Sequence, residues 1–443
     1  MMWGIDRACA SAALAAIVAS ASPAGAETLQ DAWTRAYQTN PTIQAARARL
    51  RATEELKPQA RAAGLPQISA TGLYENSSVD QTVNDAAFSE DEAATSELRS
   101  FDLDTLTGRV DGELAVFTGL RNFNAIRQAR ARIEAGGAAL AAVEQNVLAR
   151  VAAAYFDVVR DQKIYDATAQ NVRVLLKQQR DTERLFAVGD VTRTDVAQAG
   201  ARLDGAKADL TNAQARLEIS RLTYKELTGE TPDTLDPNPT APEAPETLDA
   251  ALRIADDYAP RVVAARANEE AARRGVAIAK SAFAPQVSLT TRYEISEDPS
   301  SFVLDEDEFS FGVRATVPLF LGGQNFSRVR EAKALNDEAR RLIVEAERRT
   351  AAEVAANWRL LEAARANTTT AASQLNANDE ALNGVRREAQ LGRRTTLDIL
   401  DAEGERLASA VALAEAERDA RVATIDVLAS AGVLVRDAGA AAE

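Results

Sequence analysis

Apolar residues recur at helical spacing over most of this chain, in runs of unusual length. The pattern predicts helices at residues 29–62, with a break near Pro41, and at 121–187, 195–228, 248–283, 323–390 and 396–431. Because each helical residue adds about 1.5 Å, the longest runs span on the order of 100 Å, far beyond an ordinary globular helix.

The segment 195–228 carries an unbroken heptad pattern. Sustained spacing of this kind is typical of a coiled coil, and alanine in the seam lets neighbouring helices approach closely. A generic helical bundle is the alternative for these helices taken alone. One seam position holds Val196, Leu203, Leu210, Leu217 and Tyr224, and the other holds Ala199, Ala206, Ala213, Ser220 and Leu227.

Four shorter segments alternate apolar and polar residues instead: 66–75, 106–117, 286–294 and 309–320. Segments of this length with one apolar and one charged face are typical of outer-membrane β-strands. A half-buried sheet in a soluble sandwich gives the same alternation, but four such strands in two hairpins of an otherwise helical chain favour the membrane. Since four strands cannot close a barrel and an open edge is costly in lipid, copies of the chain must pool their strands.

The two halves of the chain repeat one pattern. Thr28-Leu29 and Pro41 return as Thr247-Leu248 and Pro260, at an offset of 219. After a shorter loop, Gly189 and Asp195 return as Gly392 and Asp398, at an offset of 203. Two copies of one long-helical unit with two strands each are typical of a tube wall rather than of an enzyme pocket.

The repeat sets the predicted domain boundaries. The first copy covers 27–228, with a β-hairpin at 66–117 and a helix–turn–helix tip at 188–194. A proline-rich linker at 229–247 leads to the second copy, 248–432, with a hairpin at 286–320 and a tip at 391–395. Residues 433–443 form a short tail.

The beginning of the chain resembles a secretory signal peptide over residues 1–26. Arg7 precedes an apolar stretch, and Ala24-Gly25-Ala26 fits a cleavage site. A single anchor helix is the alternative, although the apolar stretch is short for a bilayer. Cys9 precedes the apolar run, so we expect no lipid anchor. No later segment is apolar enough for a spanning helix.

Composition narrows the chemistry. The net charge is −15 and the pI about 4.8, which disfavours a nucleic-acid partner. The chain has no histidine, and its one cysteine lies in the leader, which excludes Cys/His zinc sites, disulfides and Cys or Ser-His nucleophiles from the mature chain. Carboxylate-only hydrolysis stays formally open, but no pocket motif supports it. We expect no enzyme activity, no metal and no cofactor.

The hairpin connections at 76–105 and 297–308 are strongly acidic, and we expect exposed, mobile loops there. Calcium binding by the run Asp305-Glu306-Asp307-Glu308 is the alternative, although its spacing matches no EF-hand loop. The first connection carries Asp80, Asp85, Glu90, Asp91, Glu92, Glu97, Asp102 and Asp104.

Paired motifs in this order resemble the TolC family of outer-membrane efflux and secretion channels, over nearly all of the mature chain. The strongest are the two tips, Val188-Gly189-x-x-Thr192-x-Thr194-Asp195-Val196 and Leu391-Gly392-x-Arg394-Thr395-Thr396-Leu397-Asp398. Asn40-Pro41 and the Leu-Phe-x-Gly-Gly of 319–323 also match.

The resemblance implies an all-α-dominated homotrimer, in which three chains form one twelve-stranded barrel in the outer membrane and a helical barrel across the periplasm. Its tip would dock a periplasmic adaptor, which links it to an inner-membrane ABC, RND or MFS-type pump. A soluble periplasmic coiled-coil adaptor or scaffold is the alternative. Because the mature N-terminus lacks cysteine, type I protein secretion is slightly favoured over drug efflux.

Several tip residues are candidates for function. Asp398 and Asp401 share one helical face, and in a trimer they would form two carboxylate rings that favour cations. Merely complementing the dipole of the helix N-terminus is the alternative. The resemblance also implies a gate network at the closed tip, with Arg394 as the cation and Thr194 and Asp195 as acceptors. A solvent-facing Arg394 with no gate role is the other interpretation.

Two further expectations concern the turns. Gly189 and Gly392 allow tight turns, and we place adaptor contact at the exposed pairs Val188/Thr192 and Leu391/Thr395, with a pure turn role as the alternative. Well-known family members carry a tyrosine three residues before the second tip glycine. This chain has Ala389 there, so any contact by which that tyrosine helps to hold the tip closed is absent or replaced.

Overall fold

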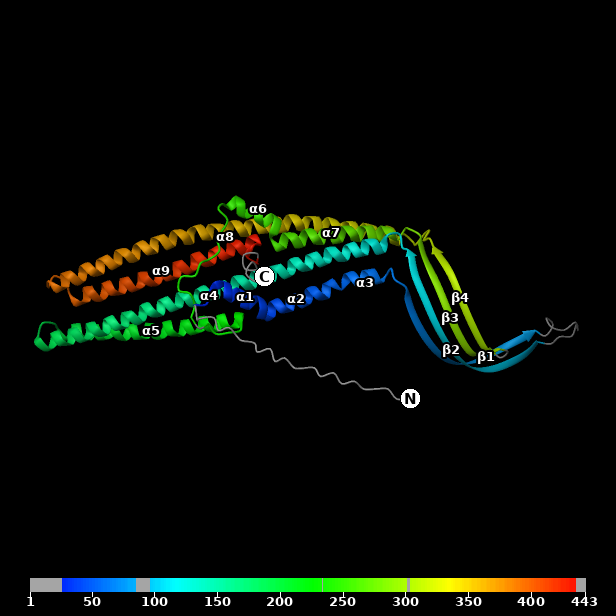
Figure 1. The fold of residues 1–443 in the computed structure, drawn as a ribbon, viewed down its shortest axis with the longest axis horizontal. Coiled ribbons are helices and arrows are strands. Elements are labelled where there is room, and N and C mark those ends of the chain that lie inside the picture. Colours follow the sequence, from blue (N-terminus) through cyan, green and yellow to red (C-terminus); the bar gives the residue numbers. More distant parts are fainter. Residues whose placement is uncertain (1–25, 85–95, 233, 301–302, 436–443) are drawn as a thin grey trace, which may run out of the picture.

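The computed structural model describes residues 26–84, 96–232, 234–300 and 303–435. The predicted leader, apart from Ala26, and the end of the predicted tail lie outside these ranges. Within them the chain forms an elongated body of helices that carries a curved, four-stranded sheet at one end (Figure 1).

Four helices run along the body. Two of them, α4 (Arg121–Val188) and α8 (Gln324–Gln390), have 68 and 67 residues and match the lengths that the sequence predicts. Two shorter ones, α5 (Arg193–Thr228) and α9 (Thr396–Ala431), have 36 residues each and fold back from the tips. The structure therefore confirms the two long helical hairpins.

The predicted helices 29–62 and 248–283 are broken. The first consists of α1 (Leu29–Thr39), α2 (Pro41–Glu54) and α3 (Leu56–Ala62), and the second of α6 (Leu248–Tyr258) and α7 (Pro260–Ser281). Pro41 and Pro260 open the helices that follow the breaks, because proline lacks an amide hydrogen and pushes the preceding residue into an extended conformation.

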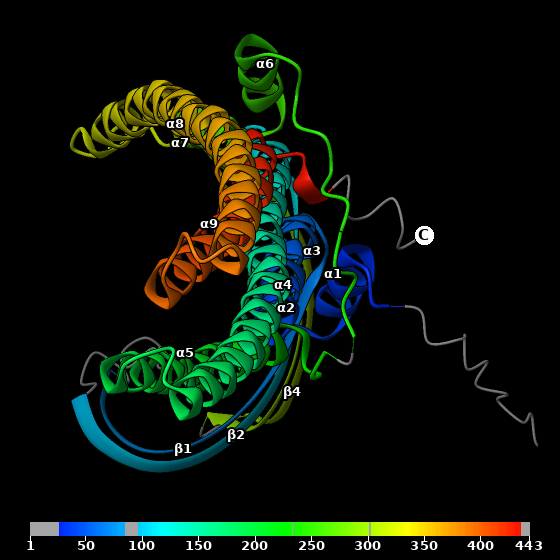
Figure 2. The same ribbon diagram turned by 90° about the vertical axis from the view of Figure 1, so that its left-hand side faces the viewer.

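The long helices, together with α2, α3 and α7, lie side by side in one curved layer with α4 at its centre, and α1 and α6 lie on its convex side (Figures 1 and 2). In the half next to the sheet, α2 and α3 pack on α4, α4 on α7, and α7 on α8. In the half next to the tips the order is α5, α4, α9, α8. The layer is concave on one side, as a segment of a tube wall must be (Figure 2).

The sheet is antiparallel throughout, with strand order β1-β2-β3-β4. Its strands are β1 (Gln67–Asn84), β2 (Ser96–Phe117), β3 (Gln286–Ser300) and β4 (Val303–Thr316). The central pairing of β2 with β3 joins the two repeats, with Val110 opposite Tyr293. Both outer strands, β1 and β4, have one edge that pairs with no strand of the described chain.

The prediction of long acidic loops is wrong for the residues that the structure describes. Asp80, Glu97, Asp102 and Asp104 lie in β1 and β2, and Glu297 and Asp305 to Glu308 lie in β3 and β4. Strands pair through their backbone groups, so the pairing continues beyond the apolar part of each strand. Asn76 and Tyr74 also donate hydrogen bonds to Asp104 on the neighbouring strand, at 2.7 and 3.0 Å. Asp85, Glu90, Asp91 and Glu92 lie outside the described residues.

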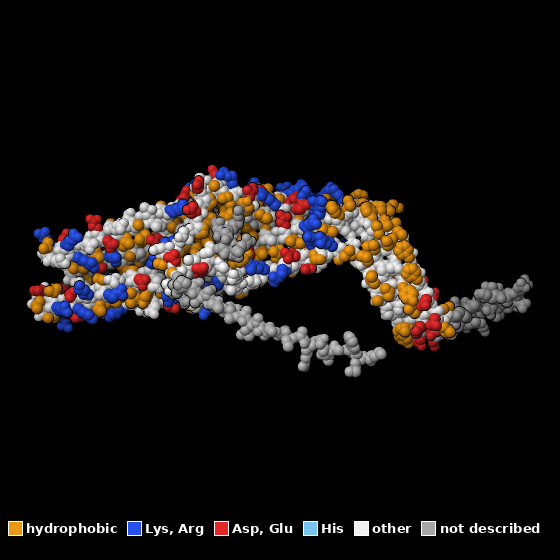
Figure 3. Space-filling view, in the orientation of Figure 1, with side chains coloured by type: hydrophobic (Ala, Val, Ile, Leu, Met, Phe, Trp, Pro, Cys, Tyr) orange, Lys and Arg blue, Asp and Glu red, His pale blue; other side chains and the backbone are white. Residues whose placement is uncertain are grey.

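The alternation of the strands is confirmed. Phe309, Phe311 and Val313 are exposed by about two thirds or more on one face of β4, at 72%, 68% and 66%. On the opposite face Arg292 of β3 pairs with Asp111 of β2 at 2.9 Å. Apolar side chains accordingly cover much of the visible sheet surface (Figure 3). Nothing in the described chain packs over this apolar face.

Two apolar clusters hold the middle of the body together. The larger gathers Trp33 of α1, Tyr155 of α4, Tyr224 of α5, Ile425 of α9 and Leu434 beyond it. The smaller lies under α6 and α7 and includes Val262, Val354 and Val427. The predicted heptad seam of α5 is also confirmed, because most of its positions are buried: Ala199, Leu203, Ala206, Ala213, Leu217, Ser220, Tyr224 and Leu227.

Among the described residues, no helix combines the length and the apolarity that crossing a membrane requires. In the same ranges, no three Asp, Glu or Cys side chains are grouped so that they could hold a metal ion.

Gly432 should be sensitive to substitution. It ends α9 with φ of 84°, and a Cβ there would lie 2.3 Å from the carbonyl oxygen of Tyr258. We expect Gly432→Ala to lower the free energy of unfolding by about 2–4 kcal/mol, through left-handed strain and a backbone clash. Thermal unfolding in detergent measures the effect.

Gly392→Ala is the matched control for this experiment. Gly392 also has a positive φ of 73°, but a Cβ there would meet no atom within 4 Å. Only strain of roughly 1–2 kcal/mol is expected. Equal losses in the two variants would contradict the packing argument.

Candidate functional site at the helical tips

The two tips, residues 188–194 and 391–395, and the helix starts that follow them have the same local structure. After α4, Gly189 takes φ of 84°, and the amide of Asp190 donates to the carbonyl of Leu185 at 3.0 Å. After α8, Gly392 takes φ of 73°, and the amide of Arg393 donates to the carbonyl of Glu388 at 2.9 Å. Glycine suits these turns because the left-handed conformation disfavours a Cβ.

A threonine and an aspartate then start the next helix at each tip. The backbone amide and the hydroxyl of Thr395 both donate to the carboxylate of Asp398, at 2.8 Å, and the amide of Asp398 donates back to the hydroxyl at 3.3 Å. Thr192 and Asp195 form the same reciprocal pair. The Thr-x-x-Asp spacing is the sequence signal for this capping box, which sequence reasoning missed.

The capping bonds affect both aspartates. Hydrogen bonds from the backbone amide and then the hydroxyl of Thr395 hold the pKa of Asp398 below its ordinary value, with Arg394 adding to the effect. The same bonds from Thr192 lower the pKa of Asp195. Both carboxylates are therefore charged at neutral pH.

The turn residues before each cap point into solvent. Val188 and Leu391 are 73% and 71% exposed. Thr192 and Thr395 are also exposed, although their hydroxyls are used as caps. The two predicted adaptor-contact pairs, Val188/Thr192 and Leu391/Thr395, are therefore left uncovered by the described chain.

Arg394 is held within its own hairpin. Its guanidinium contacts Glu388 at 2.8 Å and Asp398 at 3.8 Å. It lines a groove between the two tips, and Asp195 and Ala389 line the same groove. Among the described residues no ion pair joins Arg394 to Asp195, and Thr194 is exposed outside the groove lining. The predicted gate network of Thr194, Asp195 and Arg394 stays a prediction.

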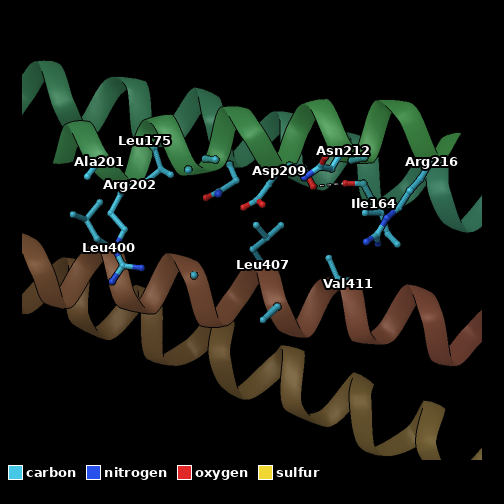
Figure 4. Close-up of a pocket in the computed structure, with 17 residues that line it drawn as sticks. Ile164, Leu175, Ala201, Arg202, Asp209, Asn212, Arg216, Leu400, Leu407 and Val411 are labelled. Atoms are coloured by element: carbon cyan, nitrogen blue, oxygen red, sulfur yellow. Dashed lines mark hydrogen bonds between the residues drawn. The ribbon is translucent and has the colours of Figure 1, made fainter. Parts of the chain in front are cut away.

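Asp401 makes a contact that sequence reasoning did not find. Arg202 of α5 reaches across to α9 and donates to the Asp401 carboxylate at 2.7 Å. This pair bridges the two helical hairpins beside a groove whose lining includes Leu175, Leu400 and Leu407 (Figure 4). Because the partners are 199 residues apart, no local pattern indicates the pair.

Two further ion pairs brace the second hairpin. Arg386 of α8 bonds Glu403 of α9, whose side chain is almost fully buried, and Arg406 bonds Asp379 at 2.6 Å. At the position of Glu403 the first repeat has Gly200, so this brace is not duplicated. Near the tips, ion pairs therefore join the two helices of the second hairpin, whereas the described pair between α4 and α5 of the first hairpin, Arg150 with Glu226 at 3.9 Å, lies far from its tip.

Comparison with known proteins identifies the family. The family model described as outer membrane efflux protein matches residues 33–230 and 252–433, which is most of the chain. This chain belongs to the outer membrane efflux protein family. The predicted resemblance to TolC-like channels is confirmed.

Individual relatives agree with the family. The chain is 29% identical to the outer membrane efflux protein BepC of Brucella suis, over 99% of this chain and 93% of the relative. It is 23% identical to the alkaline protease secretion protein AprF of Pseudomonas aeruginosa, over 92% and 84%. The solved structure of the outer membrane protein VceC of Vibrio cholerae shares the fold, with a TM-score of 0.72, 22% identity and coverage of 91% and 96%.

These findings settle the broad class. The chain is an outer-membrane efflux channel protein with a large periplasmic helical portion. The predicted fold class is confirmed, since an open sheet of four strands per chain fits a barrel shared by three copies. The relatives are channel proteins rather than enzymes, and the alternative of a soluble adaptor or scaffold is wrong.

The capped tips predict a pH dependence. Since folding lowers the pKa of Asp398, its charged form stabilises the start of α9 above the ordinary value of 3.8, and this contribution is lost as the pH falls through the lower folded value. We expect protection of residues 396–401 from hydrogen exchange, corrected for intrinsic rates, to decline below about pH 4.

Asp398→Asn should remove this decline, because an amide caps the helix without titrating. Asp401→Asn, which changes a carboxylate outside the cap, should retain it. A decline of the same size in the Asp398→Asn protein would show that another group is responsible.

Proposed function

We propose that three copies of this chain form one exit duct, which receives substrate from an inner-membrane pump through a periplasmic adaptor. The sheet supports a ring of copies, because β1 and β4 each leave one edge unpaired. In lipid those backbone groups need partners from another copy. The helical layer is likewise open at α8 on one side and at α5 with α2 and α3 on the other.

The free edges of the helical layer also carry apolar side chains suited to a neighbour. Leu335, Leu342 and Leu360 of α8 are each more than half exposed, and so are Ile219 and Leu222 of α5. Leu335 and Leu342 are seven residues apart, which places them on one seam of a coiled-coil contact. Joining these edges would bury both sets.

Adaptor contact at the tips is the next part of the proposal. The tips lie at the end of the body opposite the sheet (Figure 1), so with the sheet in the outer membrane they would lie deepest in the periplasm. Val188 and Leu391 are the large apolar side chains at their ends, and both are mostly exposed. An adaptor with apolar side chains at its own helical end would cover them.

The neck of the duct is assigned to Asp398 and Asp401. In a ring of three copies, each position would contribute three carboxylates around one axis. The Asp398 carboxylate caps its helix through Oδ2, and its other oxygen, Oδ1, is exposed to ions on the side away from Arg394, whose guanidinium lies 3.8 Å from it. Rings of carboxylates attract cations and repel anions at a constriction.

The Arg202–Asp401 pair is proposed as a tie that resists opening. Opening a helical tube requires one hairpin to move relative to the other, and this pair joins α5 of the first hairpin to α9 of the second. Both side chains are about half exposed, so that each pair contributes only about 0.2–1 kcal/mol. Three such pairs acting together would measurably shift the equilibrium between the open and closed tip towards the closed state.

Type I protein secretion is our proposal for the cargo. It is supported by a relative named for alkaline protease secretion. The relative named as an efflux protein, BepC, supports the alternative cargo class of small molecules. The duct itself is common to both.

Single-channel recording in a planar bilayer tests the duct and its neck. We expect the purified protein to show a small, cation-selective conductance that a trivalent cation blocks. Asp398→Ala/Asp401→Ala should weaken selectivity and raise the blocking concentration roughly tenfold or more, because the carboxylate rings are lost.

Asp337→Ala/Glu338→Ala removes the same charge from α8 far from the tips and should leave block unchanged. Absence of conductance from verified membrane-inserted assemblies would rule out the duct. If the trivalent cation blocks the Asp398→Ala/Asp401→Ala protein as it blocks wild type, the duct stands but the neck is not formed by these aspartates.

Disrupting the tie should favour opening. Arg202→Ala is expected to raise the mean conductance or open probability, and Arg202→Lys should keep the closed state, because a cation still pairs with Asp401 and the neck carboxylates are unchanged. Arg216→Ala, on the same helix but outside the tie, serves as the control. If Arg202→Lys behaves like Arg202→Ala, the contact does not hold the tip closed.

A further inference from the structure

The junction between helices and strands carries an exposed apolar girdle. Leu319 and Phe320 are 93% and 82% exposed where β4 leads into α8, and Leu120 and Phe123 are 62% and 50% exposed where β2 leads into α4. Aromatic and aliphatic side chains of this kind mark the membrane–water interface of outer-membrane proteins. The girdle therefore places the periplasmic surface of the bilayer at the ends of the helices.

The helical ends next to this girdle are strongly basic. Residues 56–62, 121–130, 272–281 and 324–333 together contain 11 Lys and Arg but one carboxylate, although the whole chain has a net charge of −15. In Figure 3 blue side chains are concentrated where the helical body meets the orange sheet. We call these four segments the basic collar.

Most cations of the collar lack a carboxylate partner. Arg61 on α3, Arg121 and Arg130 on α4, and Lys280 on α7 are exposed and form no ion pair with any described residue. The same holds for Arg328, Arg330 and Lys333 at the start of α8. Arg127 lies over the Phe123 ring at 4.3 Å, which fixes one cation directly beside the girdle. A concentration of unpaired positive charge at this level attracts anions.

We propose that the basic collar binds the phosphates of anionic phospholipids in the periplasmic leaflet of the outer membrane. Ten helical residues span about 15 Å, so that long Lys and Arg side chains in these segments reach headgroup depth. Basic clusters next to a membrane segment attract anionic lipids, and each such cation contributes roughly a fivefold gain in affinity.

The ring of copies adds a second reason, which rests on the proposed function. In the half next to the sheet, α8 forms one free edge of the helical layer and α2 with α3 the other. Closing the ring brings these edges together, and both are basic: Arg328 and Arg330 on one side, Lys57 and Arg61 on the other. Lipid phosphates at the seam would neutralise the repulsion.

Lipid retention by the full-length assembly tests the collar. The protein is incubated in detergent with equal amounts of phosphatidylglycerol and phosphatidylcholine, and the lipid that stays bound is measured by native mass spectrometry. We expect wild type to enrich phosphatidylglycerol. Arg328→Gln/Arg330→Gln/Lys333→Gln should reduce that enrichment at least fivefold, and Arg121→Gln/Arg130→Gln on the central helix α4 should also reduce it.

Lys177→Gln/Arg180→Gln/Arg387→Gln is the matched control, because it removes three exposed cations near the tips. It should bind lipid like wild type. No enrichment by wild type, equal loss in the control, or an α4 variant that assembles and retains full enrichment would overturn the proposal. Displacement of the lipid by millimolar inorganic phosphate would identify a free-anion site instead. Conductance of the same samples in neutral lipid tests the duct separately, so that a failure of the lipid proposal can be told from a failure of the proposed function.

Discussion

An unpaired strand edge inside a lipid bilayer has no solvent to satisfy its amide and carbonyl groups, and this chain has two such edges. Much of the architecture is consistent with that one constraint. Four strands provide an apolar outer face but no closure, so that the functional unit must contain several copies. The helical layer also needs further copies to close, since it is curved like a segment of a wall and is not a closed bundle (Figure 2).

The duplication accounts for the shared backbone structure of the two halves but not for the differences between their charged residues. The two tips have the same turn and the same capping box, because Gly, Thr and Asp recur at equivalent positions. Charge differs between them: Arg394 and the Arg386–Glu403 brace occur only in the second hairpin. The repeats therefore share backbone geometry while the second one carries most of the ionic contacts near the tip.

Much of the fold could be predicted from the sequence, because long helices and alternating strands have strong local patterns. Pro41, Pro58 and Pro260 also indicate where helices break; the break at Glu55 comes before Pro58, which has no amide hydrogen to donate to the carbonyl of Glu54. Strand ends were misjudged because backbone pairing carries β1 and β2 on through acidic residues such as Asp102. The Arg202–Asp401 contact could not be predicted, since it depends on how two hairpins 199 residues apart align along the wall.

The larger apolar cluster has a consequence for biogenesis. Trp33 near the start of the chain packs in the same cluster as Ile425 and Leu434 near its end. Contacts between residues so distant in sequence form late, because most of the loop between them must be ordered first. An early segment cannot complete this cluster on its own while the rest of the chain is still being made and exported. Until the last segment is in place, the apolar side chains of this cluster stay uncovered, and the unfinished chain is prone to aggregate.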